Sequence, residues 1–265
     1  MMSELPEPLS DEMQENFRRL FKFCGGRPRA RRLIRSMIVP CETRIGTHTM
    51  FLYPNDNWTD FKLWLDRVSP ENKSIKELEK RVSGAKAVVY DIGANCGSFT
   101  LRLADAAGAG SEIRAFEPNP IMYARLQKNL SMNTVAQTVV VHNCALGAES
   151  GTAKLNLVPG NFGEASLKAE KANAETVEVK VEPLADFFED ADGFERIMIK
   201  IDVEGYEDVV FAGFFDKVPS AKWPHDILIE TEHKDNWDID LVAEFTGRGY
   251  VNVFENEGNT LFSRS

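Results

Sequence analysis

An apolar run of strand length that enters a glycine turn and then a helical segment most constrains how this chain can fold. Residues 87–92 (AVVYDI) form this run, and residues 98–107 follow it with helical spacing. Similar apolar runs recur along the chain, at residues 112–116, 138–142, 197–201 and 227–230. Helix-like segments lie between several of them, at residues 121–132 and 206–211. Because strands that alternate with helices pair in parallel and are covered on both faces, the sequence predicts an α/β domain.

Two pairs of segments depart from this alternation. Residues 152–158 and 176–181 alternate apolar and polar side chains, which predicts an antiparallel hairpin inserted between the third and fourth core strands. Residues 250–254 and 260–262 flank a turn at 257–259 (EGN) and predict a terminal hairpin. Together with the earlier core runs, the terminal hairpin predicts a seven-stranded, mostly parallel sheet.

The first part of the chain lacks this pattern. Residues 1–85 are therefore interpreted as an N-terminal, largely helical cap or dimerisation extension, and residues 86–265 as the core domain. Helical spacing predicts helices at 11–23, 60–68 and 74–82, and a short apolar run predicts a strand at 48–53. A run of arginines follows the first helix, namely Arg27, Arg29, Arg31, Arg32 and Arg35. Such a run is usually a solvated helix face, and attraction of an anionic acceptor or a partner surface, including a homodimer, is the alternative.

Charge and composition restrict the partners. Lys and Arg total 31 against 41 Asp and Glu, so the net charge is -10 and the surface repels a nucleic-acid backbone. No apolar run approaches the roughly 20 residues of a membrane span, and the N-terminus lacks the apolar region of a secretory signal. The four cysteines form no C-x-x-C pair, which favours reduced thiols over disulfides or zinc. We therefore expect a cytoplasmic protein without a membrane span.

The turn after the first core strand has glycines spaced for a nucleotide cofactor, but not for a dinucleotide. Residues 91–97 (DIGANCG) give G-x-x-x-G, with Asn95 where the dinucleotide fingerprint has its second glycine. That second glycine lets the backbone approach a pyrophosphate, which a methionine-bearing nucleoside does not contain. The pattern therefore favours such a nucleoside over NAD. Asp91, Gly93, Asn95 and Gly97 are the predicted cofactor-binding residues of this turn.

Polar residues at the ends of the next two strands extend the predicted cofactor site. Glu117 lies 20 residues after Gly97, where a carboxylate can accept hydrogen bonds from both ribose hydroxyls and would repel the phosphate of NADP. Asn119 follows on the same strand end, and Asn143 and Ala145 follow the third strand, where an adenine can lie. Each feature has a plainer alternative, such as a tight turn or an acidic residue at a helix N-terminus. Their combined order and spacing favour a nucleotide site.

These motifs resemble the FkbM family of methyltransferases. The resemblance covers roughly residues 88–232 and is carried by VVYDIGANCGSFTLRLA, AFEPNP and, above all, IKIDVEGYE at 199–207. It implies a class I methyltransferase fold, a Rossmann-like sandwich, with S-adenosylmethionine as cofactor. It also implies O-methylation of hydroxyls on sugars, polyketides or related metabolites. The first 80 residues and the loop at 161–163 carry little of the match, so the resemblance does not identify the acceptor.

Methyl transfer from a sulfonium requires the protein to align the acceptor, exclude water and remove a hydroxyl proton. Ligands of parallel sheets bind beyond the carboxyl ends of the strands. Asp202 and Glu204 follow the fourth strand, and Glu230, Glu232 and His233 follow the fifth, so we expect them to converge. Asp202, Glu204 and His233 are the predicted catalytic residues, with His233 or a carboxylate as general base. Mg²⁺ held by Asp202 and Glu230 is the less favoured alternative, and no metal ligand is assigned.

Two other functions remain alternatives. An NAD-dependent oxidoreductase is disfavoured because Asn95 and Ser98 stand where its fingerprint has glycines. A catalytically silent binding module that keeps the cofactor fold is disfavoured by four intact residues, namely Gly93, Gly97, Glu117 and Asp202. The sequence therefore predicts an S-adenosylmethionine-dependent O-methyltransferase that acts on a hydroxyl of a small molecule or sugar.

Overall fold

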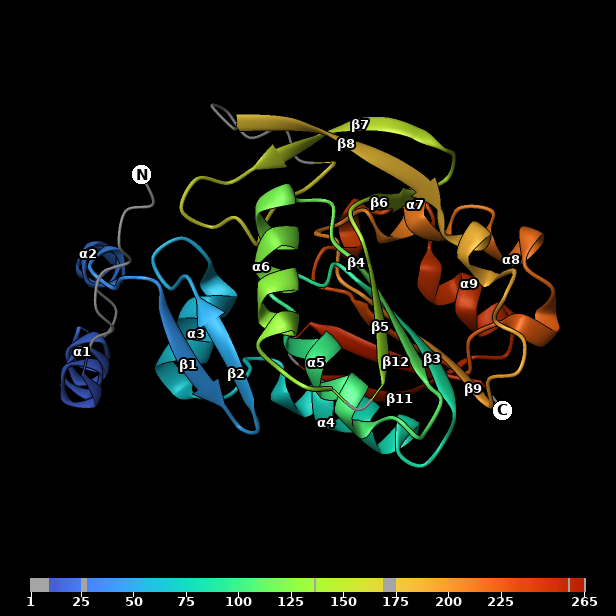
Figure 1. The fold of residues 1–265 in the computed structure, drawn as a ribbon. Helices are drawn as coiled ribbons and strands as arrows, with labels where there is room; N and C mark the ends of the chain where they lie inside the picture. Colours follow the sequence, from blue (N-terminus) through green and yellow to red (C-terminus); the bar gives the residue numbers. More distant parts are fainter. Residues whose placement is uncertain (1–9, 25–27, 136, 169–174, 257, 265) are drawn as a thin grey trace.

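A seven-stranded sheet forms the centre of the computed structural model, which describes residues 10–24, 28–135, 137–168, 175–256 and 258–264 (Figure 1). The strands are β3 (Ala87–Ile92), β4 (Glu112–Phe116), β5 (Thr138–His142), β9 (Arg196–Ile201), β10 (Asp226–Glu230), β11 (Val251–Asn256) and β12 (Asn259–Ser263). Their order in the sheet is β11-β12-β10-β9-β3-β4-β5. β12 runs antiparallel to both of its neighbours, and the other pairs are parallel. The predicted α/β fold with one antiparallel strand is confirmed.

Alternate residues of the central strand β3 face two different hydrophobic cores. Val88, Tyr90 and Ile92 pack with α7, α8 and α9, whereas Ala87 and Val89 pack with α4 and α5. α6 covers the same face as α5, over β4 and β5. Because successive strand residues point to opposite faces, an apolar strand is buried on both sides. The helices are α4 (Asn72–Val82), α5 (Ser98–Ala106), α6 (Pro120–Ser131), α7 (Glu207–Phe211), α8 (Phe214–Lys217) and α9 (Leu241–Gly247).

The inserted hairpin is confirmed and belongs to a second, three-stranded sheet with the order β6-β8-β7. Its strands are β6 (Ala145–Gly147), β7 (Gly151–Leu157) and β8 (Glu175–Pro183), with β7 and β8 antiparallel. The sequence did not predict β6, because three residues are too few to show a period. In Figure 1 this sheet arches over the end of α6 and the central sheet. Short 3₁₀ helices follow at η1 (Leu184–Phe188), η2 (Ser220–Lys222) and η3 (Lys234–Asn236).

The N-terminal extension contains helices and also a β-hairpin. Its elements are α1 (Asp11–Phe23), α2 (Pro28–Ser36), β1 (Cys41–Ile45), β2 (His48–Leu52) and α3 (Trp58–Asp66), whereas α4, which also lies within residues 1–85, packs on the central sheet. β1 was not predicted, since its buried positions include a threonine and a cysteine rather than large apolar residues. The hydrophobic core of the extension continues into the core domain at Cys96, Leu101 and Met122. Arg27 of the arginine run and Glu257 of the terminal turn lie outside the described residues. Within the described residues, no helix combines the length and apolar character needed to cross a membrane.

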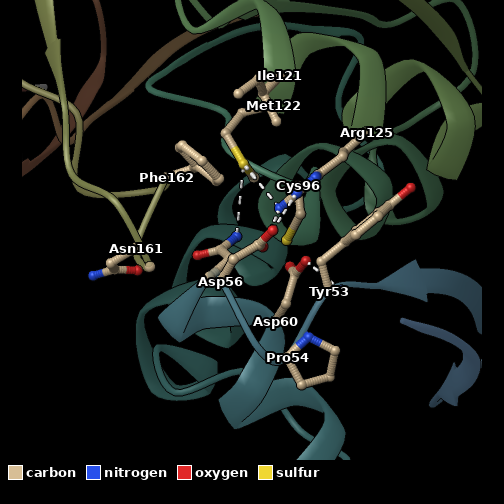
Figure 2. A network of polar contacts seen from close by, with 12 residues as sticks. Tyr53, Pro54, Asp56, Asp60, Cys96, Ile121, Met122, Arg125, Asn161 and Phe162 are labelled. Atoms are coloured by element: carbon tan, nitrogen blue, oxygen red, sulfur yellow. Dashed lines mark hydrogen bonds and ion pairs between the residues drawn. The ribbon is translucent and has the colours of Figure 1, made fainter. Parts of the chain in front are cut away.

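Buried polar residues join the extension to α6 and to the turn after β3 (Figure 2). Arg125 of α6 donates to both carboxylate oxygens of Asp56, at 2.8 and 2.9 Å, and its guanidinium lies 3.8 Å from the centre of the Tyr53 ring. Asp60 is fully buried, accepts from the Tyr53 backbone N–H at 2.9 Å and contacts the Cys96 thiol. Because the contacts of Arg125 and of Cys96 link the extension to the core, the network fixes the position of the extension beside the predicted cofactor turn.

The buried carboxyl of Asp60 makes stability depend on pH. Burial raises the pKa of Asp60 to about 6, whereas an unperturbed aspartate has a pKa of about 3.9. Its contribution to stability is therefore present below about pH 4 and is lost as the pH rises through about 6. Asp60→Asn removes the titration, so the free energy of unfolding of the parent relative to this variant should fall by about 2 kcal/mol between pH 4 and pH 7.

Chemical denaturation of both proteins at these two pH values measures this difference. Asp235→Asn is the control, since Asp235 is exposed and its substitution should leave the pH dependence unchanged. An equal difference between the parent and Asp60→Asn at both pH values would show that Asp60 is not a perturbed, buried carboxyl.

Candidate functional site

A cavity of about 290 Å³ lies at the carboxyl ends of the central strands, and we call it the strand-end cavity. It brings together most of the predicted site residues, which are Gly93, Asn95, Glu117, Ala145, Asp202, Glu204, Glu230, Glu232 and His233. These residues follow different strands of the sheet and meet because parallel strands end at the same edge. The predicted convergence of the groups after β9 and β10 is therefore present in the structure.

The turn after β3 requires glycine because other backbone approaches it closely. Gly93 has a φ of +77°, and a Cβ built there would lie 1.9 Å from the backbone oxygen of Asp202. Gly97 has a φ of +90°, and its Cβ would lie 2.6 Å from Cδ1 of Leu126. Residues with a side chain rarely adopt such φ values. Both positions therefore favour glycine, because of the backbone conformation and because of the lack of space for a Cβ. At Gly93 the result is bare backbone in the wall of the strand-end cavity, which suits close approach by a ligand.

Glu117 supplies a buried carboxylate to the cavity wall. Its residue is 6% exposed, and its two oxygens accept from the backbone N–H groups of Asn95 and Asn119 at 2.8 and 2.9 Å. Burial raises the pKa of Glu117 to about 7, even though both hydrogen bonds favour the charged form. An ionised carboxylate has about four acceptor sites, so it can also accept from a ligand that bears two hydroxyls.

Lys200, which was not predicted as a site residue, lies beneath the cavity. Its Nζ donates to the backbone oxygen of Gly93 at 2.9 Å and lies 3.6 Å from Oδ1 of Asp91 and 4.0 Å from Oδ2 of Asp202. Burial lowers the pKa of Lys200, but these carboxylates outweigh it and raise the pKa above its usual value. Asp91 also accepts from the Thr100 hydroxyl at 2.5 Å. A lysine between Ile199 and Ile201 in the buried part of β9 was the sequence signal for this buried cation.

Some predicted cofactor residues support the cavity wall without lining it, and these are Asp91, Gly97, Asn119 and Asn143. Asn119 caps α6 by accepting from the Ile121 N–H at 3.0 Å, and its amide donates to the backbone oxygen of Phe162 at 2.8 Å. Asn143 donates to the backbone oxygen of Glu117 at 2.8 Å. Both asparagines therefore hold the strand ends in place through their side-chain amides.

His233 lies close to the carboxyl groups of Glu204 and Glu230. These three residues follow β9 and β10 and border one end of the strand-end cavity. Nε2 of His233 lies 3.5 Å from Oε2 of Glu204, and ligand atoms of Glu204, Glu230 and His233 all lie within 4.8 Å of one another. Glu204 has a φ of 57°, a conformation that is costly for a residue with a side chain. Such strain persists where the surrounding structure enforces it, often at functional sites.

Glu230 differs from the other carboxyls of this group. Burial and the neighbouring carboxylates of Asp202 and Glu204 raise its pKa well above the usual range. Glu230 is therefore protonated at neutral pH and can donate to Asp202. Glu232 is exposed and lies at the rim, against Gly258. The wall of the strand-end cavity thus carries less negative charge than the number of its acidic residues indicates.

Residues of the extension and of the loop between β7 and β8 complete the cavity. Asn57, Trp58 and Asn161 were not predicted as site residues, and all three line it. The Asn57 amide donates to Oδ1 of Asn95 at 2.9 Å, and the Trp58 backbone N–H donates to Oδ1 of Asn161 at 2.7 Å. These contacts join parts of the chain that are distant in sequence, so no local pattern could have indicated them.

Comparison with known proteins agrees with this geometry. The family model described as the methyltransferase FkbM domain matches residues 91–251, which is more than half of the chain. "Methyltransferase 1" of Beauveria bassiana (strain ARSEF 2860) is 32% identical over 148 residues, which cover 49% of this chain and 59% of that protein. The "31-O-demethyl-FK506 methyltransferase FkbM" of Streptomyces tacrolimicus is 29% identical over 201 residues, which cover 64% of this chain and 75% of that protein.

A solved structure, that of precorrin-6y C5,15-methyltransferase from Geobacter metallireducens GS-15, is more distantly similar. It is 15% identical with a TM-score of 0.42, over 74% of this chain and 89% of that one. The family match, by contrast, includes the glycine turn, Glu117 and the residues after β9 and β10 that line the strand-end cavity. On this match, the chain belongs to the FkbM family of methyltransferases.

Proposed function

We propose that this protein transfers a methyl group from S-adenosylmethionine to a hydroxyl of a small molecule or sugar. The observation that carries the proposal is the strand-end cavity, which joins a bare glycine turn and a buried carboxylate to the pair Glu204 and His233. Membership of the family supports methyl transfer. The Streptomyces relative is named for a 31-O-demethyl compound, which favours an oxygen as the acceptor atom.

The residues present fit S-adenosylmethionine better than NAD. Glu117 would accept hydrogen bonds from the ribose hydroxyls, and the bare backbone at Gly93 would contact the methionine part. Asn95 has a φ of 53°, and its Oδ1 accepts from Asn57 and from the Cys96 N–H. Its side chain therefore fills the place where a dinucleotide fingerprint leaves room for pyrophosphate. When bound, S-adenosylmethionine supplies a methyl group that its sulfonium already activates.

The chain's own part in the reaction is to align the acceptor and to remove its proton. We infer that a ring nitrogen of His233 accepts the hydroxyl proton, since the nitrogen of a neutral imidazole is the commonest general base in enzymes. The carboxylate of Glu204, 3.5 Å from Nε2, stabilises the resulting imidazolium. Asp202 lies in the same wall and can hold the acceptor hydroxyl as a hydrogen-bond acceptor.

A divalent metal is the alternative mechanism at this end of the cavity. Glu204, Glu230 and His233 provide two carboxyl groups and an imidazole within 4.8 Å of one another, and Glu230 would have to lose its proton to bind a metal ion. Mg²⁺ prefers oxygen ligands, so a site that includes a histidine suits it less well than one with carboxylates alone. Asp202 and Glu230, the pair considered from the sequence, are adjacent in the same wall.

Glu117→Ala tests the cofactor site. This variant should bind S-adenosylmethionine more weakly by about 1–3 kcal/mol, because the ribose hydroxyls lose a buried partner. Calorimetric titration measures the dissociation constant, and Glu178→Ala is the control, since Glu178 is exposed on β8 outside the cavity. Unchanged affinity in Glu117→Ala would show that Glu117 does not hold the ribose.

The raised pKa of Glu117 adds a pH test of the same contact. Only the ionised carboxylate can accept from both hydroxyls without donating a proton itself. Because the pKa of Glu117 is about 7, affinity should increase between pH 6 and pH 8. The same titration of Glu117→Gln should show no such increase, and an identical pH dependence in both proteins would contradict the assignment.

Substitution of the predicted catalytic residues tests the base. Release of S-adenosylhomocysteine would be assayed with a panel of sugars and hydroxylated polyketides for the parent, Asp202→Asn, Glu204→Gln and His233→Ala. Loss of the base should reduce turnover by about 10²–10⁴-fold, with cofactor affinity unchanged. A base acting alone predicts activity that survives a chelator, whereas a metal mechanism predicts loss on chelation and recovery with Mg²⁺. Parental turnover in all three variants would refute the catalytic assignment.

A further inference from the structure

A second cavity, of about 630 Å³, adjoins the strand-end cavity, and we call it the arginine cavity. Arg31, Arg32 and Arg35 of α2 line it, and Trp58 and Asn161 line both cavities. No carboxylate among the described residues lines the arginine cavity. In a chain with a net charge of -10, a basic cavity without acidic side chains is a local reversal of the overall charge.

Arg35 is held in the wall of the arginine cavity by hydrogen bonds to the backbone. Its Nε donates to the backbone oxygen of Pro54 at 2.7 Å, and its NH2 group donates to that of Gly160 at 2.9 Å. Its guanidinium carbon also lies 5.8 Å from the centre of the Trp58 ring. Because these contacts tie α2 to Pro54 in the rest of the extension and to Gly160 in the loop between β7 and β8, the arginine cavity is an organised part of the fold.

The other two arginines retain capacity to bind a ligand. Arg31 packs its guanidinium 4.2 Å from the centre of the Phe21 ring, and its Nε is buried without a hydrogen-bond partner within the described part of the chain. Arg32 is exposed and forms no ion pair with any carboxylate that the structure describes. A buried N–H donor without a partner is unfavourable, and guanidinium groups bind planar or tetrahedral oxyanions with paired hydrogen bonds.

We propose that the arginine cavity binds an anionic group, a phosphate, sulfate or carboxylate, of the same acceptor whose hydroxyl is methylated in the strand-end cavity. This inference rests on the proposed function and narrows the acceptor to anionic molecules. Trp58 and Asn161 line both cavities, so the two cavities lie side by side and an acceptor that extends past these residues would occupy both. The aromatic face of Trp58 also offers an apolar surface for the part of the acceptor between its anion and its hydroxyl.

The test uses the full chain with inorganic phosphate and acetate as separate probes, each titrated by calorimetry at low ionic strength. The parent should bind at least one probe, and the tighter of the two indicates whether the acceptor's anion is phosphate-like or a carboxylate. Binding of that probe should weaken by at least about tenfold in the single variant Arg32→Gln and in the double variant that carries both Arg31→Gln and Arg32→Gln. Arg32→Lys should restore part of it, because the charge returns without the paired donors.

Arg29→Gln is the matched control, since Arg29 is exposed on the same helix and does not line the arginine cavity. It should bind the probe as the parent does. A parent that binds neither probe, or an Arg32→Gln variant that binds as tightly as the parent, would overturn the anion site. Affinity for S-adenosylhomocysteine, measured in parallel, should be unchanged in every arginine variant. If the parent does not bind S-adenosylhomocysteine, the proposed cofactor is contradicted, whereas the result on the anion site still stands.

Discussion

The contact between Lys200 and the end of β3 is the interaction on which the strand-end cavity depends. A buried ammonium is costly unless it is paired and hydrogen-bonded. Lys200 meets this requirement with the carboxylate of Asp91 and the backbone oxygen of Gly93. The end of β9 also lies so close to this turn that only glycine fits at position 93. A packing requirement of the sheet thus produces the bare backbone that a cofactor can approach.

The cavity is completed by parts of the chain outside the shared family core. The family match begins at residue 91, whereas Asn57 and Trp58 and the arginines of α2 precede it. The clamp of Arg125 on Asp56 holds this extension against α6, and therefore against the turn that carries Asn95. Relatives that share the core can consequently share methyl transfer while differing in acceptor. Specificity is expected in the extension and in the loop between β7 and β8, since both form the outer wall.

The sequence was most informative where the physical signal was local. The strands β3, β4 and β5 were predicted with their observed bounds, because each is a short apolar run that ends at a turn. β1 and β6 were not predicted, since neither contains an apolar run long enough to indicate a strand. The positions of Asn119 and Asn143 were correctly placed at strand ends, but their side chains bind backbone instead of facing the cavity. Which way an amide points depends on tertiary neighbours, so spacing alone could not decide it. Spacing alone could likewise not decide that His233 pairs with Glu204, or that Trp58 lines the strand-end cavity.

Calorimetric titration of the parent protein with S-adenosylmethionine and, separately, with NAD tests the central claim most directly. The glycine turn and the side chain of Asn95 in place of the second fingerprint glycine favour a nucleoside without a pyrophosphate, and the buried carboxylate of Glu117 suits its ribose hydroxyls. We predict saturable binding of S-adenosylmethionine at one site per chain and no measurable binding of NAD. Binding of NAD without binding of S-adenosylmethionine would contradict the assignment of the strand-end cavity as a methyl-donor site.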